Sequence, residues 1–235
     1  MDKLYIVIPA YNEAENIVSV AREWHEVVKN ISEDSRLVII DDGSKDNTYS
    51  ILNGFKGELP QLTAITKPNG GHGATVLYGY NYALSQGADY VFQTDSDGQT
   101  IPSEFREFWE SRQMFSAVIG YRNQRKDGVS RIFVSKVLKT VLWSVFKLNI
   151  PDANTPFRLI KSDVLKKYVP KIPHDFNLSN VLLTVFLVKY EKDVKFIPIT
   201  FRPRQGGINS INLRKIVKLG FQAIKDFLEL RKMMK

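Results

Sequence analysis

Short apolar runs alternate with longer helical patterns through the first hundred residues. The apolar runs, which predict strands, are Leu4–Pro9, Leu37–Asp41, Leu62–Thr66 and Tyr90–Thr94. The helical patterns that separate them are Asn12–Asn30, a stretch from about Lys45, and another over about Gly73–Ser85. Strands spaced by helices indicate right-handed βαβ units. We therefore expect an α/β fold with a Rossmann-like, mostly parallel central sheet flanked by helices.

The second half has a less regular pattern. Its predicted strands are Ala117–Gly120, Phe157–Ile160 and Val194–Ile199. Its predicted helices are Ser130–Phe146, Asn180–Tyr190 and a last one from about Leu213. No internal repeat or low-complexity linker divides the chain, so we expect a single compact domain in which two abutting halves share one sheet.

Polar residues follow three of the first four predicted strands. They are Asn12 and Glu13, Asp41 and Asp42, and Asp95 and Asp97. In an open parallel sheet the ligand crevice lies beyond the carboxyl ends of the strands. The sequence therefore predicts that these side chains converge on one pocket.

The segment Asp95-Ser96-Asp97-Gly98-Gln99 carries the clearest chemistry. Two carboxylates one residue apart can share a hard divalent cation, Mg²⁺ or Mn²⁺, and leave open positions for a diphosphate. The alternative is a solvated acidic turn. A calcium-binding helix–loop–helix does not fit, because its twelfth loop position would be Arg106 rather than glutamate.

Two other segments have both a functional and a structural interpretation. Asp42 can accept hydrogen bonds from a nucleoside base or ribose, or it can belong to an Asp-Gly turn before a capped helix. The glycine-rich run Lys67–Ala74 allows a ligand to approach the backbone, but it matches neither the dinucleotide nor the NTPase phosphate loop. We expect His72 to make loop hydrogen bonds rather than act as a base, and His25 to lie on a solvated helix face.

Composition and charge narrow the possibilities. Of 235 residues, 43% are hydrophobic, 25% are charged and none is cysteine, which excludes disordered chains, disulfide scaffolds and thiolate metal sites. Residues 1–100 carry 7 basic and 14 acidic side chains, whereas residues 101–235 carry 26 and 11. The basic half suggests nucleic acid, an anionic membrane face or a phosphorylated acceptor as partner; the alternative is a merely solubilising surface.

The N-terminus lacks the pattern of a signal peptide, and the longest charge-free apolar stretch, Phe176–Val188, is shorter than the ~20 residues that cross a bilayer. We expect a cytoplasmic protein that is soluble or held peripherally at the cytoplasmic membrane face.

Four motifs in this order resemble those of family 2 glycosyltransferases, which have the GT-A fold and an inverting mechanism. They are Ile6–Glu13, Ile40–Ser44, Asn69–Gly73 and Asp95–Asp97. The second half resembles the polyprenyl-phosphate (dolichyl-phosphate) sugar transferase branch through Gly120–Arg122, Asp152 to Leu159, and Ile197–Phe201 with Arg204 and Gly207. Pro156 and the segment His174–Asn177 depart from the pattern of that branch.

The resemblance implies roles for individual residues. The nucleotide-binding set is Pro9, Tyr11, Glu13, Asp42, Lys67, Gly73 and Asp95. The set that binds the metal and diphosphate is Asp95, Asp97 and Gln99, with Mg²⁺ or Mn²⁺ as cofactor. The acceptor-phosphate set is Arg122, Arg131, Ser135 and Arg204, the last near the donor.

The implied activity is transfer of a sugar from a UDP-, GDP- or dTDP-sugar to a polyprenyl phosphate or a saccharide such as a cell-surface glycan precursor. A phosphate acceptor needs no base, whereas a hydroxyl acceptor does, and Asp152 and Asp175 are the candidates. We expect a nucleotide-sugar-binding half (1–100), an acceptor-binding half (101–211) and a C-terminal amphipathic basic helix (212–235). That helix suits either an anionic membrane surface or packing on the core.

Two other functions are compatible with parts of the sequence. A haloacid-dehalogenase-like phosphatase would use Asp95 and Asp97, but its nucleophile motif usually opens the first strand of the chain. A non-catalytic basic module for nucleic acid would leave the acidic strand ends unexplained, so we expect no nucleic-acid partner.

Overall fold

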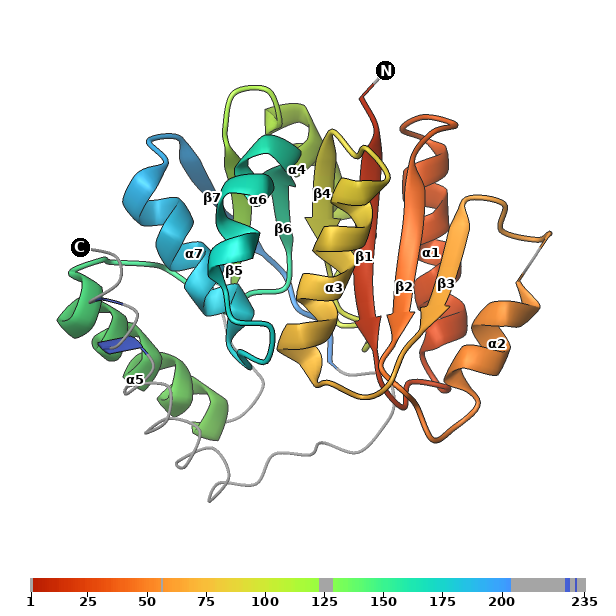
Figure 1. Ribbon diagram of the computed structural model, residues 1–235, viewed down its shortest axis with the longest axis horizontal. Helices are drawn as coiled ribbons and strands as arrows, with labels where there is room; N and C mark the ends of the chain where they lie inside the picture. The colour runs from red at the N-terminus through yellow and green to blue at the C-terminus, as the bar shows by residue number, and fades with distance from the viewer. Residues whose placement is uncertain (1, 56, 123–128, 204–226, 229–230, 232–235) are drawn as a thin grey trace.

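The computed structural model describes residues 2–55, 57–122, 129–203, 227, 228 and 231. Its seven-stranded sheet has the order β3-β2-β1-β4-β6-β5-β7 (Figure 1). The strands are β1 (Leu4–Ala10), β2 (Arg36–Asp41), β3 (Leu62–Thr66), β4 (Tyr90–Gln93), β5 (Ala117–Arg122), β6 (Arg158–Lys161) and β7 (Val194–Ile199). The α-helices are α1 (Ile17–Lys29), α2 (Thr48–Gly54), α3 (His72–Ser85), α4 (Phe105–Ser111), α5 (Val129–Phe146), α6 (Ser162–Tyr168) and α7 (Ser179–Tyr190). The predicted α/β fold with one shared sheet is confirmed.

Apolar side chains cover both faces of the sheet, which explains why the strands read as continuous hydrophobic runs. Along β1, Tyr5 and Val7 point into a core beneath α3, α5, α6 and α7, while Leu4, Ile6 and Ile8 point into a second core beneath α1, α2 and α4. Helices therefore lie on both sides of the sheet (Figure 1), and the functional groups gather at the strand ends.

The strand β6 is antiparallel to both of its neighbours, β4 and β5. The other pairs of neighbouring strands are parallel, and the arrows of β1, β2 and β3 point the same way in Figure 1. Because β6 runs backwards, the segment that precedes it reaches the edge at which β4 and β5 end. Asp152 therefore lies at the same edge of the sheet as Asp95 and Arg122.

The predicted helix Asn12–Asn30 begins later than expected, at Ile17. Residues 12–16 form turns instead, since Asn12 has a left-handed φ of 54° and side chains of the next strand end satisfy the free backbone N–H groups. The N–H of Asn12 donates to Ser44 Oγ (2.9 Å) and that of Ala14 to Asp46 Oδ2 (3.1 Å). The hydrophobic pattern did not predict the short helices α4 and α6, which have seven residues each.

The expected solvated position of His25 is wrong. The side chain is 4% exposed and packs against the segment before β3. Its Nε2 atom accepts a hydrogen bond from Gln61 N at 3.4 Å. Burial lowers the pKa of His25, so the ring is a neutral part of the packing.

Across the part of the chain that the structure describes, no helix combines the length and apolarity needed to cross a membrane. Arg204 and most of the predicted C-terminal helix lie outside the described residues. Phe227 is fully buried against Phe146 and Phe176, with ring centroids 5.9 and 6.0 Å apart, so this position packs on the core.

Candidate active site

A cavity of about 360 Å³ lies at the carboxyl ends of β1, β2 and β4. Six of the residues assigned to the nucleotide or the metal line it together: Pro9, Tyr11, Glu13, Asp42, Asp95 and Asp97. Side chains from separate parts of the chain thus meet in one place, as the strand-end pattern predicts. Six other lining residues were not among the predicted site residues, namely Ala10, Asn69, Gly71, His72, Thr75 and Ser96.

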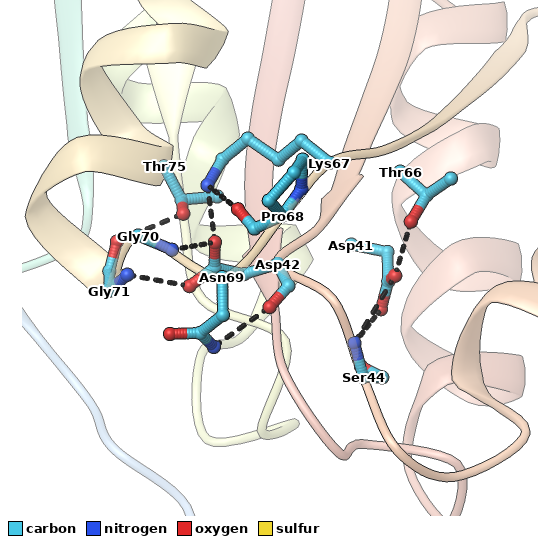
Figure 2. Close-up of polar contacts among 10 residues, drawn as sticks. All are labelled: Asp41, Asp42, Ser44, Thr66, Lys67, Pro68, Asn69, Gly70, Gly71 and Thr75. Carbon is cyan, nitrogen blue, oxygen red and sulfur yellow. Dashed lines mark hydrogen bonds and ion pairs between the residues drawn. The ribbon is translucent and has the colours of Figure 1, made fainter.

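The Asp42 carboxylate organises the glycine-rich loop (Figure 2). Its Oδ1 atom contacts the Lys67 ammonium group and accepts a hydrogen bond from Gly70 N (2.9 Å), and its Oδ2 atom accepts one from Gly71 N (2.8 Å). Burial alone raises the pKa of Asp42, but the hydrogen bonds from Lys67 and Gly70 outweigh it and hold the pKa below its ordinary value. The carboxylate is therefore ionised and the loop is held closed around it.

The adjacent carboxylates of Asp41 and Asp42 avoid repulsion by taking different partners (Figure 2). Asp41 accepts hydrogen bonds from Ser44 N (3.2 Å) and Thr66 Oγ1 (2.8 Å). Asp41 thus stabilises the turn after β2, which leaves Asp42 as the residue that faces the cavity.

The first strand end supplies a second buried carboxylate and an exposed ring. Glu13 is 8% exposed, and its Oε2 atom accepts a hydrogen bond from Asn16 Nδ2 at 2.7 Å. Its backbone N–H donates to Thr48 Oγ1 (2.9 Å), which ties this loop to the start of α2. Tyr11 remains 42% exposed, so its ring offers a flat apolar surface beside polar groups that can accept hydrogen bonds.

Asp95 and Asp97 bring carboxylate oxygens to the cavity from the end of β4. Asp95 Oδ1 lies 3.1 Å from His72 Nε2 at the start of α3. Desolvation disfavours the charged ring, but the hydrogen bond and charge of Asp95 outweigh it and raise the pKa of His72. His72 is thus a hydrogen-bonding group, as expected, and its partner is one of the two proposed metal ligands.

Gln99 does not line the cavity that Asp95 and Asp97 line. It is 7% exposed, and its side-chain Nε2 donates to the carbonyl of Arg202 at 3.0 Å, while Arg202 N donates back to Gln99 O at 2.8 Å. Within the described ranges, no cluster of three acidic or histidine side chains is arranged to hold a metal by itself. The two carboxylates and their hard oxygen donors fit Mg²⁺ or Mn²⁺ only if a ligand completes the coordination.

Lys67 and Gly73 shape the cavity without lining it. Lys67 acts through Asp42, as described above. Gly73 packs directly against the backbone before α7: a Cβ at this position would lie 2.2 Å from the Phe176 carbonyl oxygen. Glycine is required there for close packing of α3.

The acceptor candidates within the described residues lie at the end of β5 and in the first half of α5. Arg122 makes a bidentate ion pair with Asp152, with Nε–Oδ2 and Nη2–Oδ1 distances of 2.7 and 3.0 Å. Asp152 and Ser135 line a small cavity of about 60 Å³ together with Lys139. Arg131 lies in α5, but its side chain is outside the described part. Asp175 is exposed in the turn before α7 and does not line the donor-side cavity.

The sheet order and a carboxylate-lined cavity at the strand ends define an α/β transferase-type site that suits a nucleoside diphosphate and a cation. Residues 5–169 match the model of glycosyl transferase family 2. The chain belongs to this family, which favours the transferase over the phosphatase and the binding module.

Two of the similar curated proteins are named for a sugar transfer to undecaprenyl phosphate and for the synthesis of a polyprenol monophosphomannose. The chain is 22% identical over 222 residues to undecaprenyl-phosphate 4-deoxy-4-formamido-L-arabinose transferase of Pseudomonas fluorescens (strain Pf0-1), with 93% of this chain and 63% of the relative covered. It is 23% identical to polyprenol monophosphomannose synthase of Mycolicibacterium smegmatis, with 88% and 80% covered. It spans 63% and 39% of the length of two of the arabinose transferases.

A solved structure confirms the GT-A fold. Glucosyl-3-phosphoglycerate synthase from Mycobacterium tuberculosis, in complex with Mn²⁺, UDP and glucosyl-3-phosphoglycerate, superposes with a TM-score of 0.70 at 15% identity. The match covers 98% of this chain and 80% of that one.

Proposed function

We propose that this protein is an inverting glycosyltransferase that moves a sugar from a nucleotide-diphosphate sugar to a polyprenyl phosphate. The observation that carries the proposal is the cavity in which Glu13, Asp42, Asp95 and Asp97 meet. Family membership and the names of the curated relatives support the same reaction. The complex of glucosyl-3-phosphoglycerate synthase contains Mn²⁺ and UDP, so a divalent cation and a UDP-sugar are the cofactor and donor to test first.

The donor side supplies recognition for each part of a nucleoside diphosphate. The exposed ring of Tyr11 can stack on the base, and the buried carboxylate of Glu13 can accept hydrogen bonds from ribose hydroxyls. Asp95 and Asp97 would hold the divalent cation, which neutralises charge on the departing diphosphate. Asp42 holds the loop 67–71 in the shape that forms the cavity wall.

The reaction exchanges one bond for another at the anomeric carbon. The acceptor phosphate oxygen forms a bond to that carbon as the bond to the β-phosphate oxygen breaks on the opposite face, and the nucleoside diphosphate leaves with the electron pair. The acceptor is already anionic at neutral pH, so no base is needed. Arg122 lies at the same sheet edge and can bind that phosphate.

The outer face of α5 supports a membrane-borne acceptor. Trp143 is 58% exposed, Val137 is 42% exposed, and Lys147 Nζ lies 4.8 Å from the Trp143 ring centroid. Lys136 and Lys139 are exposed on the same helix, and its described side chains include no acidic residue. An exposed tryptophan among lysines suits the interface of an anionic bilayer. We propose that the protein acts peripherally at a cytoplasmic membrane face.

A transfer assay tests the proposal. The purified chain is incubated with undecaprenyl phosphate, Mn²⁺ and radiolabelled UDP-glucose, GDP-mannose or dTDP-glucose, and the lipid fraction is counted. One donor should give a labelled lipid, and EDTA should abolish it. Transfer to a free saccharide but not to the lipid would replace the acceptor, and phosphate release from p-nitrophenyl phosphate with no sugar transfer would overturn the proposal.

A further inference from the structure

The Arg122–Asp152 ion pair is largely enclosed. The side chain of Arg122 is 13% exposed and that of Asp152 is 7% exposed, and the carboxylate takes both Nε and Nη2 of the guanidinium. The Nη1 atom of Arg122 has no partner within the described ranges. The Phe201 ring lies against the guanidinium, 5.2 Å from Cζ to the ring centroid. Among the described residues, the Nη1 edge of this fixed arginine is thus available to an anion.

A second arginine holds the segment that carries Asp152. Arg158 is 0% exposed at the start of β6. Its Nε donates to Thr155 O at 3.0 Å, and Nη2 contacts the same carbonyl and that of Ala153 at 3.4 Å. Nη1 donates to Asn180 O (3.0 Å) and Thr184 Oγ1 (3.1 Å) in α7. The guanidinium therefore clamps residues 153–155 to α7.

Every hydrogen-bond partner of Arg158 in the described part of the chain is a neutral oxygen. Burying a cation without a carboxylate in contact costs free energy, so each of the five N–H groups of the guanidinium needs a hydrogen-bond acceptor. Arg158 pairs with Gln93 of β4 and Ile119 of β5 in the sheet. Gln93 precedes Asp95 by two residues, and Ile119 precedes Arg122 by three. Arg158 therefore lies close to the ends of both strands.

We propose that Arg158, Asp152 and Arg122 form a positioning relay for the acceptor phosphate. Arg158 holds the carbonyls of Ala153 and Thr155. Between them, the N–H of Asn154 donates to Asp152 Oδ1 at 3.2 Å, and Asp152 aims the Nη1 edge of Arg122 at the phosphate. Asp152 is a positioning residue rather than a general base, since its two oxygens are occupied by Arg122. The inference rests on the proposed function and names the residues that determine use of a phosphate acceptor.

A double-mutant cycle on Arg122 and Asp152 tests the relay. The four proteins are the wild type, Arg122→Ala, Asp152→Asn and the double variant, and the exposed Asp34→Asn is the matched control. The first readout is the affinity for farnesyl phosphate, and the second is kcat and KM for transfer to undecaprenyl phosphate. Donor-site integrity is checked by thermal stabilisation with UDP and Mn²⁺.

Asp152→Asn should weaken farnesyl phosphate binding and raise the acceptor KM by about tenfold, as expected for loss of a charge-assisted contact. In the Arg122→Ala background, Asp152→Asn should change the affinity and the KM by less than about twofold, because Asp152 acts on the phosphate only through Arg122. A general base would instead lower kcat in both backgrounds. Additive losses, a fall in kcat alone, or no farnesyl phosphate binding by the wild type would overturn the relay.

Arg158→Lys provides a second test, because lysine cannot donate to both faces of the clamp. Arg158→Lys should still be stabilised by UDP and Mn²⁺, and its acceptor KM should be higher than that of the wild type. In the Arg122→Ala background, Arg158→Lys should no longer raise the acceptor KM. Persistence of the effect in the Arg122→Ala background would contradict the relay. Farnesyl phosphate binding that shows the coupling between Arg122 and Asp152, with no sugar transfer, would refute the proposed function and leave the relay standing.

Discussion

The Lys67 ammonium group contacts Oδ1 of Asp42 in a pair whose side chains are 14% and 5% exposed. The pair joins the end of β3 to the end of β2, and the glycine-rich loop closes on the same carboxylate through Gly70 and Gly71 (Figure 2). The donor-side cavity thus has a wall that is stabilised by one enclosed ion pair. Changes to this pair should affect both stability and nucleotide binding.

Lys67→Met removes the cation and leaves Asp42 with its backbone donors. The free energy of unfolding should fall by about 1–3 kcal/mol, since an enclosed charge loses one partner. Urea denaturation measures the change, and the exposed Lys45→Met is the control, with an expected effect within about 0.5 kcal/mol. Equal stability of the two variants would show that the pair contributes nothing.

The contribution of Asp42 to stability should depend on pH. Its pKa in the folded protein lies below the ordinary value of 3.8, so the stabilisation is present above pH 3.8 and is lost as pH falls through the folded pKa. The stability difference between the wild type and Asp42→Asn should be constant from about pH 7 to 5 and should shrink below about pH 4. A difference that stays constant down to about pH 3 would contradict this interpretation.

Gly73→Ala should disrupt the packing of α3 against the segment before α7. The added methyl group would lie 2.2 Å from the Phe176 carbonyl oxygen, and forcing backbone apart typically costs about 1–3 kcal/mol or more. Gly54→Ala is the matched control, since nothing lies within 4 Å of its Cβ position in α2, and alanine should be neutral or stabilising there. Thermal unfolding of both variants gives the comparison.

The converging strand ends were predictable because the carboxyl ends of parallel strands share one edge, whatever the details of packing. Glu13, Asp42 and Asp95 illustrate this, since each follows a strand whose apolar pattern is clear. The position of Asp152 was not predictable in the same way. It reaches that edge only because β6 is antiparallel, and the run Arg158–Lys161 does not itself reveal its direction.

The contacts of individual side chains were the hardest feature to predict from the sequence. Gln99 follows the carboxylate pair and looks like a ligand, yet it is buried against Arg202, which lies 103 residues away. Gly73 resembles part of a phosphate-binding loop, and the sequence did not predict its close contact with the Phe176 backbone. Both outcomes depend on contacts between distant segments, which local patterns do not encode.

The proposed sugar transfer requires that the cavity at the ends of β1, β2 and β4 bind a nucleoside diphosphate together with a divalent cation. Isothermal titration of UDP, GDP and dTDP with and without Mn²⁺ measures this binding, on the wild type and on Asp97→Ala, whose half-buried side chain makes a folding defect unexpected. We expect one nucleotide to bind only with Mn²⁺, and Asp97→Ala to lose that binding while unfolding at the wild-type temperature. Absence of binding by all three nucleotides, or equal binding by the wild type and Asp97→Ala, would contradict the proposed donor site.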